Sequence, residues 1–133
     1  MKFPYQRKEG KTYPLIPIVL VYKKKKLLTE ALLDSGANIS LFQDSIAEYL
    51  GIKVEEGEKI ELLGIGGRII AYIHQVELAI DGIKFPCKIA FSWELPVSVN
   101  ILGRDNFFEK FFVCFNEIKK ESILEERGNW GRF

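Results

Sequence analysis

The chain has 133 residues, of which 47% are hydrophobic and 28% charged, a balance that excludes a disordered chain and favours one domain over residues 1–133. Its net charge of +1 gives no global reason to expect nucleic acid as a partner. A single histidine and two distant cysteines argue against a zinc site or a Cys/His catalytic centre, so we expect no metal and no cofactor.

The first apolar run, residues 15–22, follows basic residues, as the core of a signal peptide does. Pro14 and Pro17 interrupt it, however, and lysines occupy residues 23–26, where a small-residue cleavage site would stand. The run is also too short to cross a bilayer. The sequence therefore predicts a strand here, and a cytoplasmic protein without a membrane partner.

A second apolar run, residues 27–33, follows the lysines, and the two runs together are typical of a hairpin with a charged turn. The lysines could also form a nucleic-acid patch. We favour a solvated turn, because one short run without net basicity leaves little electrostatic footprint.

The second run ends on Asp34-Ser35-Gly36-Ala37. Asp and Gly are poor strand residues, so this stretch either presents the carboxylate of Asp34 or simply turns the chain. Taken alone, the tripeptide favours an ordinary turn. The apolar strand before it and the strand-like residues 39–42 after it strengthen the functional interpretation.

Two short helices are predicted. Ser45 and Glu48 have the spacing of a capping box, and Gly51 is well placed as a left-handed C-terminal cap, which predicts a helix over residues 45–50. A second helix is predicted near residues 104–110, after Gly103.

A glycine-rich stretch, residues 64–67, lies between the strand-like residues 59–63 and 68–72. A phosphate site is disfavoured because a strand follows instead of a helix, and no Lys-Ser/Thr pair is present. A mobile hairpin tip close to a bound chain and an ordinary hairpin turn remain open.

Further hairpins follow along the chain. Asp81-Gly82, between the alternating residues 76–80 and 83–91, is the strongest hairpin signal of the sequence. A last hairpin is predicted from residues 112–115 to residues 122–124. The fold class is therefore mainly β with two short helices, with a core over about 13–125 and a flexible tail over 126–133.

The stretch Asn100-Ile101-Leu102-Gly103-Arg104-Asp105 is typical of an apolar strand that ends on glycine before a helix. Alone, it is an ordinary strand-to-helix turn. Three motifs in this order resemble the retropepsin-like aspartic proteases: residues 34–37, residues 64–67 and residues 101–105. The resemblance covers residues 14–124 and is closer to cellular and prokaryotic members than to viral enzymes. It implies a closed β-barrel fold with one lobe per chain.

The resemblance also implies roles for the first motif. Asp34 would be the catalytic carboxylate, and Ser35 would join the hydrogen-bonded grip between two active-site loops of a dimer. Gly36 would offer its carbonyl to a bound peptide, and Ala37 is a small residue also found in many viral members.

The other motifs receive roles in the same way. The hairpin over residues 61–72 would be the flap, with Ile65, Gly66 and Gly67 at its tip, and Asn38 would also belong to the substrate-binding set. Residues Ile101, Leu102 and Gly103 would support the active-site loop from behind.

The resemblance implies that Arg104 pairs with a residue near this loop and helps to hold the dimer. In viral enzymes an acidic residue stands there, and here that place corresponds to Asn38. Arg104 would then need another acid, and Glu30, Asp44 and Asp105 are the candidates. The charged, glycine-bearing tail does not suggest the chain-end sheet that viral enzymes share between subunits.

The function implied is that of an aspartic endopeptidase acting as a homodimer, with one Asp34 per chain and a polypeptide substrate. Two adjacent carboxylates share a proton and activate water between them. The substrate would be extended, with apolar side chains facing pocket walls built from Ile65, Ile69, Val97 and Val99. The alternatives are a non-catalytic dimerisation or peptide-binding module of the same fold, and a β-rich interaction domain whose motifs are accidental turns.

Overall fold

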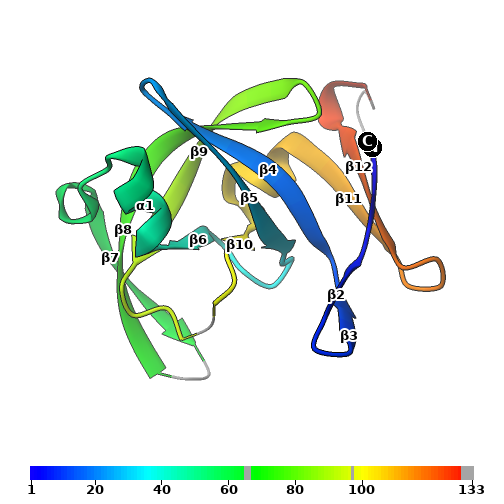
Figure 1. Ribbon diagram of the computed structural model, residues 1–133, viewed down its shortest axis with the longest axis horizontal. Helices are drawn as coiled ribbons and strands as arrows, with labels where there is room; N and C mark the ends of the chain where they lie inside the picture. The colour runs from blue at the N-terminus through cyan, green and yellow to red at the C-terminus, as the bar shows by residue number, and fades with distance from the viewer. Residues whose placement is uncertain (65–66, 97, 130–133) are drawn as a thin grey trace.

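The computed structural model describes residues 1–64, 67–96 and 98–129 (Figure 1). Its strands are β1 (Lys2–Pro4), β2 (Gln6–Lys8), β3 (Lys11–Tyr13), β4 (Leu15–Tyr22), β5 (Lys25–Leu33), β6 (Ser40–Gln43), β7 (Glu58–Gly64), β8 (Gly67–Ile80), β9 (Ile83–Ser92), β10 (Ile101–Leu102), β11 (Phe111–Asn116) and β12 (Glu121–Glu126). The helical segments are α1 (Asp44–Leu50) and the short turns η1 (Val54–Glu56), η2 (Arg104–Phe108) and η3 (Arg127–Asn129).

The main sheet has the strand order β4-β5-β10-β6-β9-β8-β7, and β4 also pairs with β8, so that the sheet closes on itself in a ring (Figure 1). β10 runs parallel to β5 and antiparallel to β6, while β6 runs parallel to β9. The mainly-β class predicted from the sequence is confirmed. The largest fully buried side chains include Ile16, Leu20, Phe42, Leu78, Phe91, Leu102 and Phe107.

Helix α1 begins at Asp44 and not at Ser45, and the predicted capping box is wrong. The N-cap residue is Gln43, which makes no side-chain cap bond, because β6 leads directly into the helix and leaves Ser45 inside its first turn. The C-terminal cap is as predicted: Gly51 has φ 78°, and its N–H donates to the carbonyls of Ala47 and Glu48.

The second predicted helix, near residues 104–110, is not a regular helix. Within η2, Asp105 has φ −63° and ψ 127°, and Asn106 has φ 67° and ψ −51°. Asn106 is held in this left-handed conformation from two sides. Its Oδ1 accepts from the N–H of Lys88 at 2.7 Å, and its own N–H donates to Glu109 Oε1 at 2.6 Å. The polar side chains therefore override the local helical pattern.

The hairpins follow their turn chemistry. Asp81 and Gly82 both have positive φ, 48° and 81°, as the tight turn between β8 and β9 requires. β4 pairs with β5 and β11 with β12, in the regions that the sequence predicted. β7 pairs with β8 as far as Gly64 opposite Gly67.

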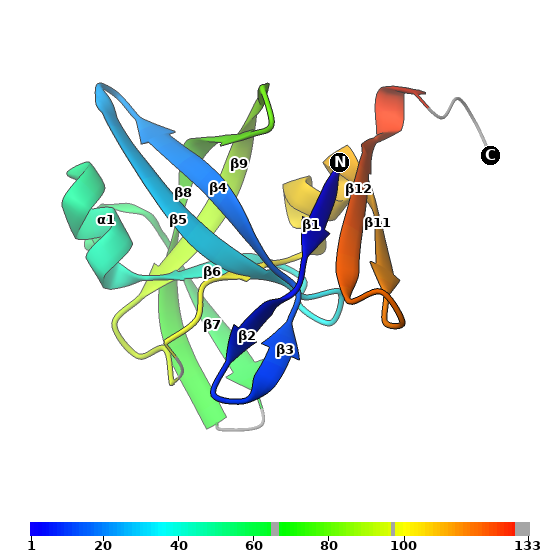
Figure 2. The same ribbon diagram turned by 45° about the vertical axis from the view of Figure 1, so that its right-hand side comes forward.

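The two ends of the chain form a second sheet, in which β12 lies between β1 and β11 (Figure 2). The amine of Met1 donates to the carbonyl of Leu124 at 3.0 Å, and the N–H of Leu124 donates to the carbonyl of Met1 at 2.9 Å. β1 therefore belongs to the folded part, although it lies before the predicted core boundary near residue 13. At the other end, residues of the predicted flexible tail continue β12 to Glu126 and form η3, where Arg127 donates to the carbonyl of Phe108.

No helix among the described residues is long and apolar enough to cross a membrane. The same residues contain no cluster of three or more His, Cys, Asp or Glu side chains that could hold a metal ion.

Candidate active site

Asp34 follows β5 directly and is fixed by hydrogen bonds within its own loop. The N–H of Gly36 donates to Asp34 Oδ1 at 2.9 Å, and the N–H of Ala37 donates to the Asp34 carbonyl at 3.2 Å. This side-chain-to-backbone turn holds the Asp34 carboxylate just beyond the end of β5, whose last residue, Leu33, is buried. Ser35 and Gly36 are exposed at the tip of the loop.

Strand β10 supports this loop from behind, with Ile101 opposite Leu32 and Leu102 opposite Leu33 in parallel register. The carbonyl of Leu102 accepts from the N–H of Asp34 at 3.0 Å. Beyond the strand, the N–H of Arg104 donates to the carbonyl of Ala37 at 2.9 Å. The backbone on both sides of Gly103 is thus bonded to the loop that carries Asp34.

Gly103 lies at the closest approach of the two segments. A Cβ atom placed on it would lie 2.6 Å from the carbonyl carbon of Ile39 and 2.9 Å from the carbonyl oxygen of Ala37, so any other residue would push the segments apart. Its N–H donates to the buried Oγ of Ser40 at 3.0 Å.

Arg104 has a neutral partner. Its guanidinium donates to Oδ1 of Asn38, on the loop that follows Asp34. The predicted pairing with another acid is wrong: Glu30 pairs with Lys8 at 3.4 Å, and no carboxylate in the described part of the chain forms an ion pair with Arg104. An amide oxygen can accept from a guanidinium, so Asn38 fills the place of the acid without its charge.

The Asp34 loop opens on a cleft of about 640 Å³ beside the β7–β8 hairpin. Its lining joins the loop, the hairpin and the segment after β9, and consists of Asp34, Gly36, Ala37, Asn38, Ile39, Leu41, Leu62, Leu63, Gly67, Ile69, Glu94, Leu95, Pro96 and Ile101. Most of these side chains are apolar, and Asp34 and Glu94 are the two carboxylates among them.

The predicted flap and wall residues are brought together in part. Gly67, with φ 113°, and Ile69 line the cleft with Asp34. The predicted tip residues Ile65 and Gly66, and the wall residue Val97, lie outside the described residues. Val99 lines another cleft, of about 780 Å³, and Ile101 lines both clefts.

The segment Glu94-Leu95-Pro96 lines the cleft but was not predicted from the sequence. It contains neither a glycine pattern nor a titratable pair, so only its position after β9 reveals it.

The cysteine nearest to this segment in the sequence is Cys87. Its side chain is fully buried, and burial raises the pKa of its thiol to about 12, which makes it a poor nucleophile. Among the described residues, Asp34 and Glu94 supply the ionisable side chains of the cleft lining.

Comparison with known proteins gave three results. A family model described as aspartyl protease matches residues 23–105, more than half of the chain. A search of curated proteins found no match. Among solved structures, EIAV protease in complex with the inhibitor HBY-793 is similar, with a TM-score of 0.57 and 20% sequence identity over 78% of this chain and 93% of that one. At this identity the likeness shows a shared fold, and the family match shows the lineage: the chain belongs to the aspartyl protease family, in its retropepsin-like group.

Proposed function

We propose that the protein is an aspartic endopeptidase that acts as a homodimer, with one Asp34 from each protomer at the shared site. Family membership supports aspartic protease activity in general. The observation that carries the proposal is the placement of Asp34 in a loop fixed by Gly36, Leu102 and Arg104, at the wall of an apolar cleft.

The chemistry needs two carboxylates. Adjacent carboxyl groups cannot both ionise comfortably, so they share one proton and titrate as a pair. The ionised member takes a proton from water as general base, and the protonated member polarises the scissile carbonyl and later donates to the leaving amine.

A second copy of the chain is the proposed source of the other carboxylate. The second carboxylate in the lining, Glu94, lies after β9 and accepts a hydrogen bond from the backbone N–H of Ile70, which ties it to the β7–β8 hairpin. A two-fold axis beside the Asp34 loop would bring the two copies of Asp34 together. Ser35, exposed at the tip of the loop, is available to a partner loop in such a dimer.

The proposed substrate is an extended polypeptide. The cleft between the Asp34 loop and the β7–β8 hairpin is lined by Gly36 and by the apolar side chains of Leu62, Ile69 and Leu95. The carbonyl of Gly36 is the proposed acceptor for the peptide backbone. Extended peptides are bound by backbone hydrogen bonds and by pockets for alternate side chains. We therefore propose a preference for apolar side chains on both sides of the cut.

The test compares the wild-type protein with Asp34→Asn on an unfolded protein substrate between mildly acidic and neutral pH. Asparagine keeps the Oδ1 that accepts from Gly36, so the loop should retain its shape while the acid is lost. We expect cleavage to fall by at least about a hundredfold, with an unchanged melting temperature. A statine-type transition-state mimic should block the wild-type activity.

Equal cleavage by both proteins would contradict the proposal and identify a contaminating protease. Binding of the peptide mimic without any cleavage by the wild-type protein would instead favour the non-catalytic peptide-binding module.

A further inference from the structure

The pairing of β8 with β9 ends before the part of β8 that lines the cleft, where β8 pairs with β7 in the β7–β8 hairpin. It runs from Ile80 opposite Ile83 to Tyr72 opposite Phe91, and β9 ends at Ser92. Ile70 lies two residues beyond the last ladder pair on β8, where a longer β9 would have supplied backbone partners. On the other side, Ile70 stands opposite Glu61 of β7, the last strand of the main sheet.

Two side chains bond the backbone groups of Ile70 where β9 no longer pairs with β8. Ser92 Oγ donates to the carbonyl of Ile70 at 2.6 Å, and the N–H of Ile70 donates to Glu94 Oε1, also at 2.6 Å. The N–H of Glu94 donates in turn to Ser92 Oγ at 3.0 Å, which closes the group. Both backbone groups of Ile70 are therefore held, and we call Ser92 and Glu94 together the hairpin clamp.

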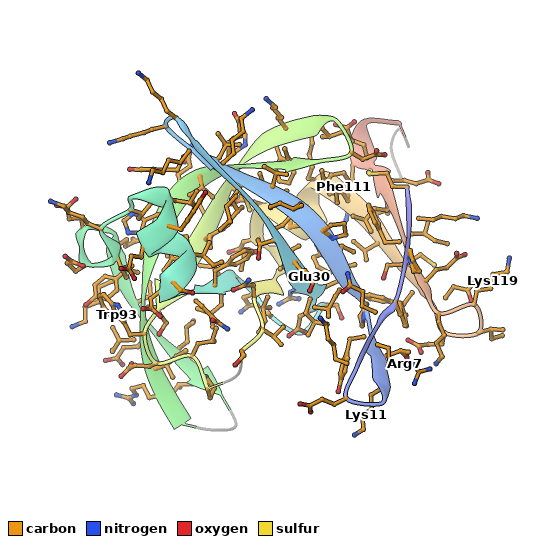
Figure 3. All side chains as sticks on the ribbon, in the orientation of Figure 1. Arg7, Lys11, Glu30, Trp93, Phe111 and Lys119 are labelled. Atoms are coloured by element: carbon orange, nitrogen blue, oxygen red, sulfur yellow. The ribbon has the colours of Figure 1, made fainter. Side chains whose placement is uncertain are left out.

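The clamp is supported by its surroundings. Ser92 is 1% exposed, so its hydroxyl is held in one arrangement by packing. Trp93, which Figure 3 labels, stands between the two clamp residues and is exposed. Its ring packs edge-on against that of Tyr72 of β8, with ring centroids 5.8 Å apart. This aromatic contact fixes the segment against the same strand that the clamp holds.

Both sides of the clamp lead into the cleft. Along β8, the residues just past Ile70 include Ile69 and Gly67, which line the cleft with Asp34. Along the other segment, Glu94 is followed by Leu95 and Pro96, which line the same cleft. Beyond Ile70, β8 pairs with residues 62–64 of β7. A two-stranded ribbon without further support is only marginally stable.

We propose that Ser92 and Glu94 are positioning residues, which set the orientation of the β7–β8 hairpin relative to Asp34. They act through the backbone of Ile70 and need not touch substrate. The structural part of this inference is independent of catalysis, and its kinetic consequence rests on the proposed function.

Amide hydrogen exchange tests the structural part without any need for activity. The variants are Glu94→Ala, which removes the acceptor, Glu94→Gln, which keeps an acceptor oxygen, and Ser92→Ala. Glu77→Ala, an exposed carboxylate on the same strand, is the matched control. We expect the Ile70 amide to exchange on the order of 10- to 100-fold faster in Glu94→Ala, because a hydrogen bond to a charged group is lost.

In the Glu94→Gln variant, the exchange rate of the Ile70 amide should stay much closer to that of the wild-type protein. In Glu77→Ala it should equal the wild-type rate. Exchange at Ile80, at the far end of the ladder, should be unchanged in all variants that fold. If Ser92→Ala does not fold, the pair Glu94→Ala and Glu94→Gln still decides the question.

Kinetics test the consequence. With a looser hairpin, substrate must order it on binding, so we expect Glu94→Ala to raise KM by about tenfold and to change kcat less. Glu94→Gln should restore most of the KM. Unchanged Ile70 exchange in Glu94→Ala would overturn the inference. Faster exchange in a protein that never cleaves peptide would uphold the clamp while contradicting the proposed function.

Discussion

Ser40 and Ser122 are both fully buried, yet they differ in their hydrogen bonds. Ser40 Oγ accepts from the N–H of Gly103, at the closest contact between the support strand and the Asp34 loop. Ser122 Oγ, in the chain-end sheet, has no hydrogen-bond partner among the described residues. A buried polar group without a hydrogen-bond partner destabilises the folded state, whereas a buried hydrogen bond stabilises it.

We therefore predict opposite effects of the same substitution. Ser40→Ala leaves the buried N–H of Gly103 without an acceptor and should lower the free energy of unfolding by about 1–3 kcal/mol. Ser122→Ala removes an unsatisfied hydroxyl and should be neutral or stabilising by up to about 1 kcal/mol. Urea denaturation of both variants measures the difference, and equal destabilisation would show that Ser122 has a partner.

At the scale of elements, turn chemistry explains what was predictable. The strand pairs β4–β5, β8–β9 and β11–β12 follow from apolar runs and short polar turns, and Asp81-Gly82 takes the conformation that its composition predicts. Local patterns failed where a side chain had a stronger partner elsewhere. Asn106 bonds to Lys88, far away in sequence, and thereby breaks the helix predicted near residues 104–110.

The candidate site was predictable to a similar depth. Three motifs indicated Asp34, its support strand and its hairpin, because each motif is local. The contribution of Glu94 was not predictable, since it depends on where β9 stops relative to Ile70. The exclusion of a side chain at Gly103 likewise depends on a contact with Ile39, 64 positions earlier.

The first strand is held to the β11–β12 turn by Tyr5. Its hydroxyl donates to Glu117 Oε1 at 2.8 Å, and its N–H donates to the carbonyl of Lys120 at 2.8 Å. Burial, with the hydrogen bond to Glu117, raises the pKa of Tyr5 to about 12. Hydrogen bonds from Tyr5 and Lys120 lower the pKa of Glu117 below its ordinary value.

These shifts predict a pH-dependent effect of Tyr5→Phe. A raised phenol pKa gives stability that is complete below about pH 10 and is lost as the pH rises towards 12. A lowered carboxyl pKa gives stability that is complete above about pH 4.3 and is lost as the pH falls below that value. The melting temperature of Tyr5→Phe should therefore lie furthest below that of the wild-type protein near neutral pH.

Thermal unfolding across the pH range measures this difference, with Tyr13→Phe as the control for loss of a tyrosine. A Tyr5→Phe deficit that stays constant from pH 3 to pH 11 would contradict the assignment of the two shifts to this hydrogen bond.

At the scale of the whole molecule, closure depends on pairs of distant segments. β4 meets β8 across the ring, and β1 meets β12 at the chain ends. Neither pairing has a sequence signature, because turn residues specify neighbouring strands and not which distant edges meet. The sheet of β1, β12 and β11 is built from segments of a single chain.

A homodimer with one Asp34 per subunit predicts inhibition by an inactive subunit. When wild-type and Asp34→Asn chains are mixed equally and allowed to exchange, random pairing leaves about a quarter of the dimers with two aspartates. Activity per wild-type chain should then fall by about half, measured as the initial cleavage rate. Mixing with Glu48→Gln, which alters an exposed carboxylate in α1, is the control.

Activity that is unaffected by Asp34→Asn chains, in a sample shown by sedimentation to exchange subunits, would contradict a site shared between two chains.

The hydrogen bond between Arg104 and Asn38 has a consequence for how acid acts on the protein. An amide has no proton to gain over the range in which carboxylates titrate, so this link beside the Asp34 loop keeps its strength as the solution is acidified. A carboxylate in the same place would lose its charge on acidification and weaken its hold on Arg104. Here the link is neutral, so in the proposed dimer a loss of activity in acid would not arise from this hydrogen bond.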